Sequence, residues 1–144
     1  MEIKIHAWQL GSKKDTITPQ PFYIHCPPAT LRELIRECVY CCVQTYNSRL
    51  DENDTPNPLS KVEIENMSNI GKIAFGFNYN GKRAIPHEAY ENAISCYEDG
   101  LYRVFLDDEE LADLDSPIIL SEGSTITFIR LTMLAGRSFF GGIL

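Results

Sequence analysis

The sequence predicts an α+β fold, because apolar residues follow the period of a strand near both ends of the chain and the period of a helix between them. Residues 1–10 alternate between apolar and polar side chains, and residues 124–129 do so again. Residues 30–46 carry apolar side chains at i, i+3 and i+4 spacing, as a helix with one buried stripe does. The chain has 144 residues, which is enough for one domain with a sizeable core.

The first predicted element is a strand over residues 1–10 with one apolar face. A polar segment over 11–19 follows it and is longer than a tight hairpin needs. The second strand covers 22–26 and stops at Pro27 and Pro28, because proline cannot donate to a sheet ladder. The core-facing positions of the first strand are Met1, Ile3, Ile5 and Ala7.

The main helix is predicted to begin at Thr30. Thr30 and Glu33 have capping-box spacing, in which each side chain accepts a hydrogen bond from a free backbone N–H of the first turn. The polar face of this helix includes Arg32 and Arg36. Its predicted buried stripe is Leu31, Leu34, Ile35, Cys38, Cys42 and Tyr46.

The middle of the chain predicts a loop, a short helix and a hairpin. Polar composition favours a loop over 47–58, and capping-box spacing favours a short helix over about 60–70. A small hairpin is expected over 72–83, because Asn80 and Gly81 form a favoured tight-turn pair. The alternating apolar residues of this hairpin are Ile73, Phe75 and Phe77.

A second amphipathic helix and the last strands follow. Pro86 suits the first turn of a helix, and Gly100 ends it. A strand over 103–106 then runs into a turn at Asp107 and Asp108, before a very short strand or turn at Leu111. The apolar stripe of the helix is Ala89, Tyr90, Ala93, Ile94 and Tyr97, and one face of the last strand is supplied by Leu120, Ile126 and Phe128.

Charge and composition exclude several classes of protein. The formal net charge of −7 argues against a nucleic-acid partner, whose phosphates need a basic face. No apolar run approaches the roughly 18 residues of a transmembrane helix. The first strand carries an acid at Glu2 and does not resemble a signal peptide, so a cytoplasmic protein without a membrane partner is expected.

The cysteines and histidines favour packing and surface roles over a metal centre or a catalytic site. The cysteine count of 5 is odd, which disfavours a disulfide framework. Cys38 and Cys42 fall on the buried stripe of the main helix, where a free cysteine packs as a small hydrophobe. A metal or redox reading of Cys38, Cys41 and Cys42 stays open, although a structural zinc site needs four ligands. The additional ligands of such a site would have to come from Cys26, Cys96 and His25. None of His6, His25 and His87 has the sequence spacing to a serine or cysteine that indicates a nucleophile–base pair.

Four segments of the chain resemble ubiquitin-like proteins in the same order. The residue patterns that are similar to ubiquitin lie at the start of the first strand and its turn, at the start of the main helix, in the strand before the acidic turn, and in the last strand. These segments are Met1-x-Ile3-x-Ile5 before Gly11, Thr30 and Leu31 with Leu34 and Cys38, Arg103 to Leu106 before Glu110 and Leu111, and Ser124 to Ile129. The Glu98 to Tyr102 stretch and the Leu134-Ala135-Gly136 end are also similar to a group of bacterial ubiquitin-like proteins with a helical insertion.

The resemblance implies a ubiquitin-like β-grasp fold, a mixed sheet packed on one main helix, with an inserted helix and hairpin segment over about 47–100. The single domain would span 1–136, and 137–144 would be a flexible tail. The acidic turn departs from ubiquitin because it carries no lysine, so chain building there is not supported. The run from Asp107 to Asp115 is expected to be a solvated turn, with docking to a basic partner surface as the alternative.

The resemblance also implies a protein modifier rather than an enzyme. Such a protein is a precursor, trimmed to a C-terminal glycine and attached to target proteins. The implied partners are an E1-like activating enzyme, an E2-like conjugating enzyme and a processing or deconjugating peptidase, and no cofactor is implied for the chain itself. Glycine offers no Cβ near the activated carboxylate, and Gly141 and Gly142 meet this need once Ile143 and Leu144 are removed. Gly136 is the second candidate for the mature end.

The alternative is a non-covalent interaction module or assembly subunit that is never conjugated. Phe139 and Phe140 beside the paired glycines could dock on a neighbouring copy, or the tail could be an ordinary frayed terminus. Phe105 and Ile129 stand where ubiquitin has an apolar face that partners recognise. They are expected either to form an exposed patch of this kind or to be buried beneath the insertion.

Overall fold

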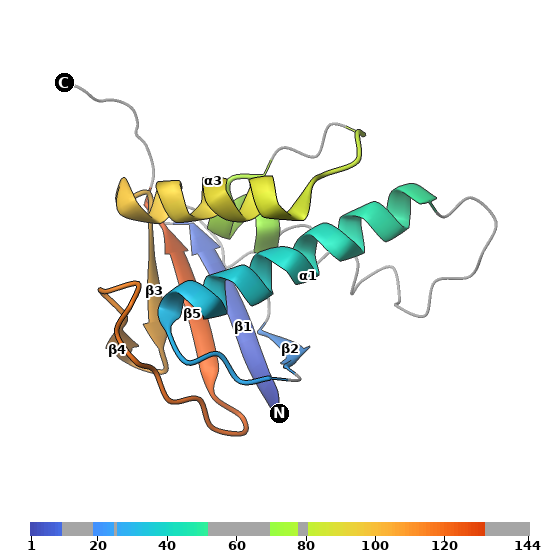
Figure 1. Cartoon of the computed structure of the whole chain (residues 1–144). Helices are drawn as coiled ribbons and strands as arrows, with labels where there is room; N and C mark the ends of the chain where they lie inside the picture. Colours follow the sequence, from blue (N-terminus) through green and yellow to red (C-terminus); the bar gives the residue numbers. More distant parts are fainter. Residues whose placement is uncertain (10–18, 25, 52–69, 78–80, 132–144) are drawn as a thin grey trace.

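The structure is a computed structural model that describes residues 1–9, 19–24, 26–51, 70–77 and 81–131 (Figure 1). Within these ranges it is an α+β protein, as the sequence predicts. Residues 70–75 are helical as well, although this helix carries no label in Figure 1. The named elements are β1 (Glu2–Gln9), β2 (Gln20–Tyr23), α1 (Leu31–Asp51), α3 (Pro86–Glu98), β3 (Tyr102–Leu106), β4 (Glu109–Glu110) and β5 (Thr125–Arg130).

The strands form one mixed, five-stranded sheet in the order β2-β1-β5-β3-β4. β1 and β5, from opposite ends of the described chain, pair in parallel at its centre, whereas the other neighbours are antiparallel. α1 and α3 lie across the same face of this sheet (Figure 1). We call the face under the helices the inner face and the opposite one the outer face.

The inner face of the sheet and the buried stripe of α1 meet in one core. The alternation predicted for the first strand is confirmed, since Ile3, Ile5 and Ala7 are buried. Every residue of the stripe predicted for the main helix is buried too, including Cys38 and Cys42. Ile126 and Phe128 of β5 complete this core. The second strand is shorter than predicted and ends at Tyr23.

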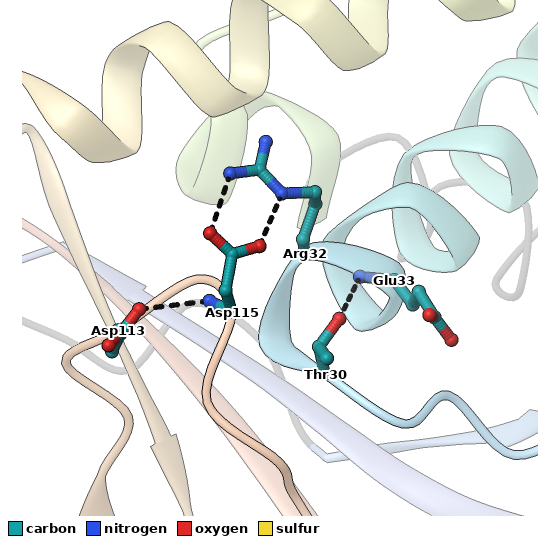
Figure 2. Close-up of polar contacts among 5 residues, drawn as sticks. All are labelled: Thr30, Arg32, Glu33, Asp113 and Asp115. Carbon is teal, nitrogen blue, oxygen red and sulfur yellow. Dashed lines mark hydrogen bonds and ion pairs between the residues drawn. The ribbon is translucent and has the colours of Figure 1, made fainter.

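The start of α1 is fixed by its cap (Figure 2). The Thr30 hydroxyl accepts a hydrogen bond from the Glu33 N–H at 3.3 Å, as the capping box predicts. The Glu33 carboxylate reaches one residue further back than expected and accepts from the Ala29 N–H at 3.0 Å. The first bond satisfies a backbone donor that the first turn of a helix leaves free, and the second holds the residue before the cap.

The same turn is tied to the segment before β5. Arg32 donates to both carboxylate oxygens of Asp115, at 3.0 and 3.3 Å, and the Asp115 N–H donates to the Asp113 side chain (Figure 2). The Arg32 N–H also donates to the Leu114 carbonyl at 2.9 Å. Residues distant in sequence are thereby held beside each other at one end of the core.

The predicted loop over 47–58 is wrong for its first five positions, because α1 continues to Asp51. Tertiary contacts extend the helix where the polar composition favours a loop. The Asn47 side chain donates to the Ala84 carbonyl and accepts from the Ala84 N–H, each at 2.9 Å. The Tyr46 hydroxyl donates to the Lys82 carbonyl at 2.6 Å.

The hairpin predicted over 72–83 is also wrong, because residues 70–75 are helical. The side chains of Ile70, Ala74 and Phe75 are buried, and the i, i+4, i+5 spacing of these residues is that of a helix. The helix ends at Gly76, whose φ is +69°. The N–H groups of Gly76 and Phe77 donate to the Lys72 and Gly71 carbonyls and satisfy two acceptors near the end of the helix. The short helix predicted over about 60–70 lies outside the described residues except for its last position.

The second amphipathic helix and the strand after it are confirmed. α3 begins at Pro86, and Gly100 has a φ of +76° just beyond its end. Ala93 and Ile94 of its predicted stripe are buried. Two tyrosine hydroxyls tie the helix to its surroundings: Tyr102 donates to the Ala93 carbonyl at 2.7 Å, and Tyr97 donates to the Leu111 carbonyl at 2.6 Å.

Candidate functional site

The outer face of the sheet carries a cluster of partly exposed side chains that includes both residues predicted for partner recognition. Phe105 pairs with Thr127, and Ile129 lies between Trp8 on β1 and Arg103 on β3. Side chains at alternate strand positions share a face, so these residues point away from Phe128 and the core. The outer-face patch is defined here as His6, Trp8, Phe105, Thr127 and Ile129, each of intermediate exposure.

The described part of the insertion packs on the other side of the sheet. The Phe75 ring lies 5.2 Å from that of Phe128 and 5.7 Å from that of Tyr102, both on the inner face. α3 also lies on the inner face (Figure 1). Phe105 and Ile129 were expected either to form an exposed patch or to be buried beneath the insertion. The described residues agree with the first expectation, since both side chains are partly exposed. Recognition of a partner there stays a prediction.

Charged groups border the patch on its β3–β4 side. Arg103 and Glu110 form an ion pair at 3.7 Å. Beyond it, Asp107, Asp108 and Glu109 are exposed, as the predicted solvated turn requires. A partly apolar surface with a charged border has the composition of a small protein-binding surface, in which the border selects the partner by charge.

The tail residues predicted for processing or docking lie outside the described residues, which end at Leu131. They are Gly136, Phe139, Phe140, Gly141 and Gly142. The last described residue makes one backbone contact: the Leu131 N–H donates to the Leu101 carbonyl at 3.0 Å. The described part of the chain therefore ends close to the C-terminal end of α3.

Arg130 is a residue that the sequence analysis missed. It follows Phe128 by two positions on β5, so its side chain points to the inner face, where a charged group is rare. Its guanidinium lies against Gly76, and a Cβ built on that glycine would come within 2.9 Å of one nitrogen. Among the residues the structure describes, Nη1 of Arg130 is buried without a hydrogen-bond partner. The alternation of side chains along the last strand is the sequence signal that places Arg130 on the inner face.

The cysteines behave as core residues. Burial raises the pKa of the Cys38 and Cys42 thiols well above the ordinary value, so both stay protonated near neutral pH. Within the described ranges, no group of three or more histidines, cysteines and carboxylates has the arrangement of a metal site. His87 lies 3.5 Å from Glu91 on the exposed side of α3, where the pair is an ordinary surface contact.

Comparisons with protein-family models, with curated proteins and with solved structures identify no similar protein. None of the helices in the described ranges is long and apolar enough to cross a lipid bilayer. The features of the chain that bear on its function are therefore the topology of the sheet, the outer-face patch and the sequence of the tail.

Proposed function

We propose that this chain is a ubiquitin-like β-grasp protein that serves as a protein modifier. It is made as a precursor, trimmed to a C-terminal glycine, and conjugated to target proteins by separate activating and conjugating enzymes. The chain is then the substrate of those enzymes and carries no catalytic residue of its own.

The observation that carries the proposal is the topology of the sheet. The parallel pair of β1 and β5 at the centre, hairpin partners on both sides and α1 across one face are what a β-grasp fold requires. In this arrangement the last strand is central and is held on both edges. The segment after Arg130 therefore leaves a rigid support, as a tail that must be presented to an enzyme should.

The sequence of that tail supplies the chemistry. A peptidase would hydrolyse the peptide bond after Gly142, or after Gly136. The activating enzyme would then join the new carboxylate to the AMP of ATP with release of pyrophosphate, and a cysteine thiolate would displace the AMP. Each step needs a narrow approach to the terminal carboxylate, which glycine permits because it has no Cβ.

The proposal is tested by the mass of the protein recovered from its native host, together with target peptides after trypsin digestion. A species ending at Gly142 or Gly136, and target side chains joined to that end, are expected. Substitution of the mature glycine by alanine should abolish conjugates, whereas substitution of the other glycine should leave them. Recovery of untrimmed Leu144 ends alone would contradict the proposal.

The outer-face patch favours a second candidate, a non-covalent interaction module or assembly subunit. Its partly exposed Trp8, Phe105 and Ile129 could bind a partner, or Phe139 and Phe140 of another copy, without any covalent step. Phe105→Ser separates the two. Loss of a bound partner with normal folding, in a chain that forms no conjugates with or without the substitution, favours the module, whereas loss of conjugates with normal folding favours recognition by the conjugating enzymes.

A further inference from the structure

The guanidinium of Arg130 occupies an unusual position for a cation. Arginine stays protonated at any physiological pH, so its charge cannot be avoided by titration. The ion pairs among the described residues involve Arg32, Arg36, His87 and Arg103, and none includes Arg130. A buried donor of a charged group that lacks an acceptor reduces stability, so the fold gains nothing from Nη1 as it stands.

Two features of the surroundings explain why the guanidinium can lie there. The helix over 70–75 ends at Gly76, and the C-terminal end of a helix carries a partial negative charge that attracts a cation. Gly76 also has no Cβ, and a methyl group there would lie within 2.9–3.2 Å of three guanidinium atoms. The Gly76 and Phe77 N–H groups already donate to the Lys72 and Gly71 carbonyls, and Nη1 of Arg130 has no hydrogen-bond acceptor among the described residues.

The position is also close to the surface. Gly76 is exposed, and Arg130 and Cys96 are partly exposed, so the guanidinium lies at the margin of the core rather than at its centre. The adjoining Leu131 N–H donates to the Leu101 carbonyl, so this margin lies beside the last described residue. Nη1 itself is buried, so an oxyanion can pair with it only after side chains at this margin move aside.

We infer that Arg130 is the centre of an oxyanion-binding site beside Gly76. The planar fork of a guanidinium matches a carboxylate or a phosphate through two parallel hydrogen bonds, which is the chemistry that Nη1 lacks. The ligand is an oxyanion, either a free phosphate-type anion or the carboxylate of a bound peptide. The site stands independently of the proposed modifier function.

The test uses the full chain and follows the side-chain Nε–Hε resonance of Arg130 by NMR while inorganic phosphate, or separately acetate, is added at constant ionic strength. A saturable change in the chemical shift of this resonance is expected with phosphate, with acetate or with both. The affinities in the two titrations show whether the site prefers a phosphate or a carboxylate. Arg130→Lys should weaken the affinity at least about tenfold, because an ammonium cannot form the bidentate pair. Arg103→Met, on the outer face, should leave the affinity unchanged.

A thermal measurement provides an independent readout. Arg130→Met removes an unpaired buried charge, so this variant should fold and should match or exceed the wild-type midpoint in chloride. Phosphate should raise the midpoint of the wild type and not that of Arg130→Met, because only a bound ligand stabilises by mass action. Equal responses of the two proteins, or an Arg130 resonance that responds to chloride as it does to both oxyanions, would overturn the inference.

Discussion

Asp107 holds the first residue of β5, Thr125, by two hydrogen bonds. The Asp107 N–H donates to the Thr125 carbonyl at 2.8 Å, and the Asp107 carboxylate accepts from the Thr125 N–H at 3.0 Å. Asp107 adopts a φ of +53°, which aspartate and asparagine tolerate better than other residues with a Cβ. The acidic turn therefore closes the β3–β5 ladder in addition to carrying charge.

The first prediction separates these contributions of Asp107. Asp107→Asn keeps an accepting oxygen and tolerates positive φ, so its unfolding free energy should lie within about 0.5 kcal/mol of the wild type. Asp107→Ala loses the acceptor and places a methyl group in the left-handed region, which should cost about 1–2 kcal/mol. Urea unfolding measures both. Equal stabilities of the two variants would show that the side-chain bond and the backbone conformation are unimportant.

The second prediction compares adjacent residues on opposite faces of the sheet. Phe128 is fully buried, so Phe128→Ala should cost about 3–5 kcal/mol of unfolding free energy. Phe105→Ser and Ile129→Ser should cost only about 1 kcal/mol each, because these side chains are partly exposed and lose mainly cross-strand contacts. Denaturant unfolding of the three variants provides the comparison. A cost for Phe105→Ser near that of Phe128→Ala would show that the outer face is covered.

The third prediction concerns thiol reactivity in the folded protein. Thiolate is the reactive form, and Cys26 is exposed, so Cys26 should react first with a maleimide or disulfide reagent at pH 8. Cys38 and Cys42 are buried with a raised thiol pKa, so they should react only on unfolding. Cys41, whose pKa is raised by burial, should be intermediate. Peptide mass spectrometry after timed labelling identifies each site, and early labelling of Cys38 would contradict the assigned packing.

The fourth prediction gives the pH dependence of the Arg32–Asp115 pair. The hydrogen bond from Arg32 lowers the pKa of Asp115 in the folded state. The contribution of the ion pair to stability is therefore present above the unfolded-state pKa of an aspartate, about 4, and is lost as the pH falls through the lower folded-state pKa of Asp115. The carboxylate is exposed, so the effect is small. Asp115→Asn should unfold at a slightly lower temperature than the wild type at pH 7 and at the same temperature near pH 2, and a difference independent of pH would exclude the ion pair as its cause.

The sequence predicted those parts of the structure that depend on long, regular patterns. The apolar stripe from Leu31 to Tyr46 spans several turns of a helix, and Ile3, Ile5 and Ala7 repeat at the two-residue period of a strand. The local sequence is therefore enough to predict both elements. Ile73, Phe75 and Phe77 fit a strand only because a short apolar run has no unique period. The continuation of α1 past Asn47 depends on Ala84, which is distant in the chain.

The candidate site was predictable to a similar degree. The outward direction of Phe105 and Ile129 follows from strand alternation, and the structure agrees with it. The same alternation places Arg130 inward, but the contact with Gly76 requires the helical fold of residues 70–75. Because the sequence pattern favours a hairpin there, it predicts no partner surface for Arg130.

The last prediction distinguishes backbone strain from steric contact at two glycines of similar conformation. Gly76 and Gly100 have φ values of +69° and +76°, so alanine should cost each of them about 1–2 kcal/mol of strain. A Cβ on Gly100 would meet nothing within 4 Å, whereas one on Gly76 would press on the Arg130 guanidinium. Gly76→Ala should therefore be less stable than Gly100→Ala in urea unfolding.

A double-mutant cycle assigns that difference to the contact. In the background of Arg130→Met, which lacks the guanidinium, the cost of Gly76→Ala should fall toward that of Gly100→Ala, while the cost of Gly100→Ala stays unchanged. If the two substitutions at position 76 and position 130 prove additive, the guanidinium does not lie against Gly76 in solution, and the acceptor for Nη1 must then be sought elsewhere on the inner face.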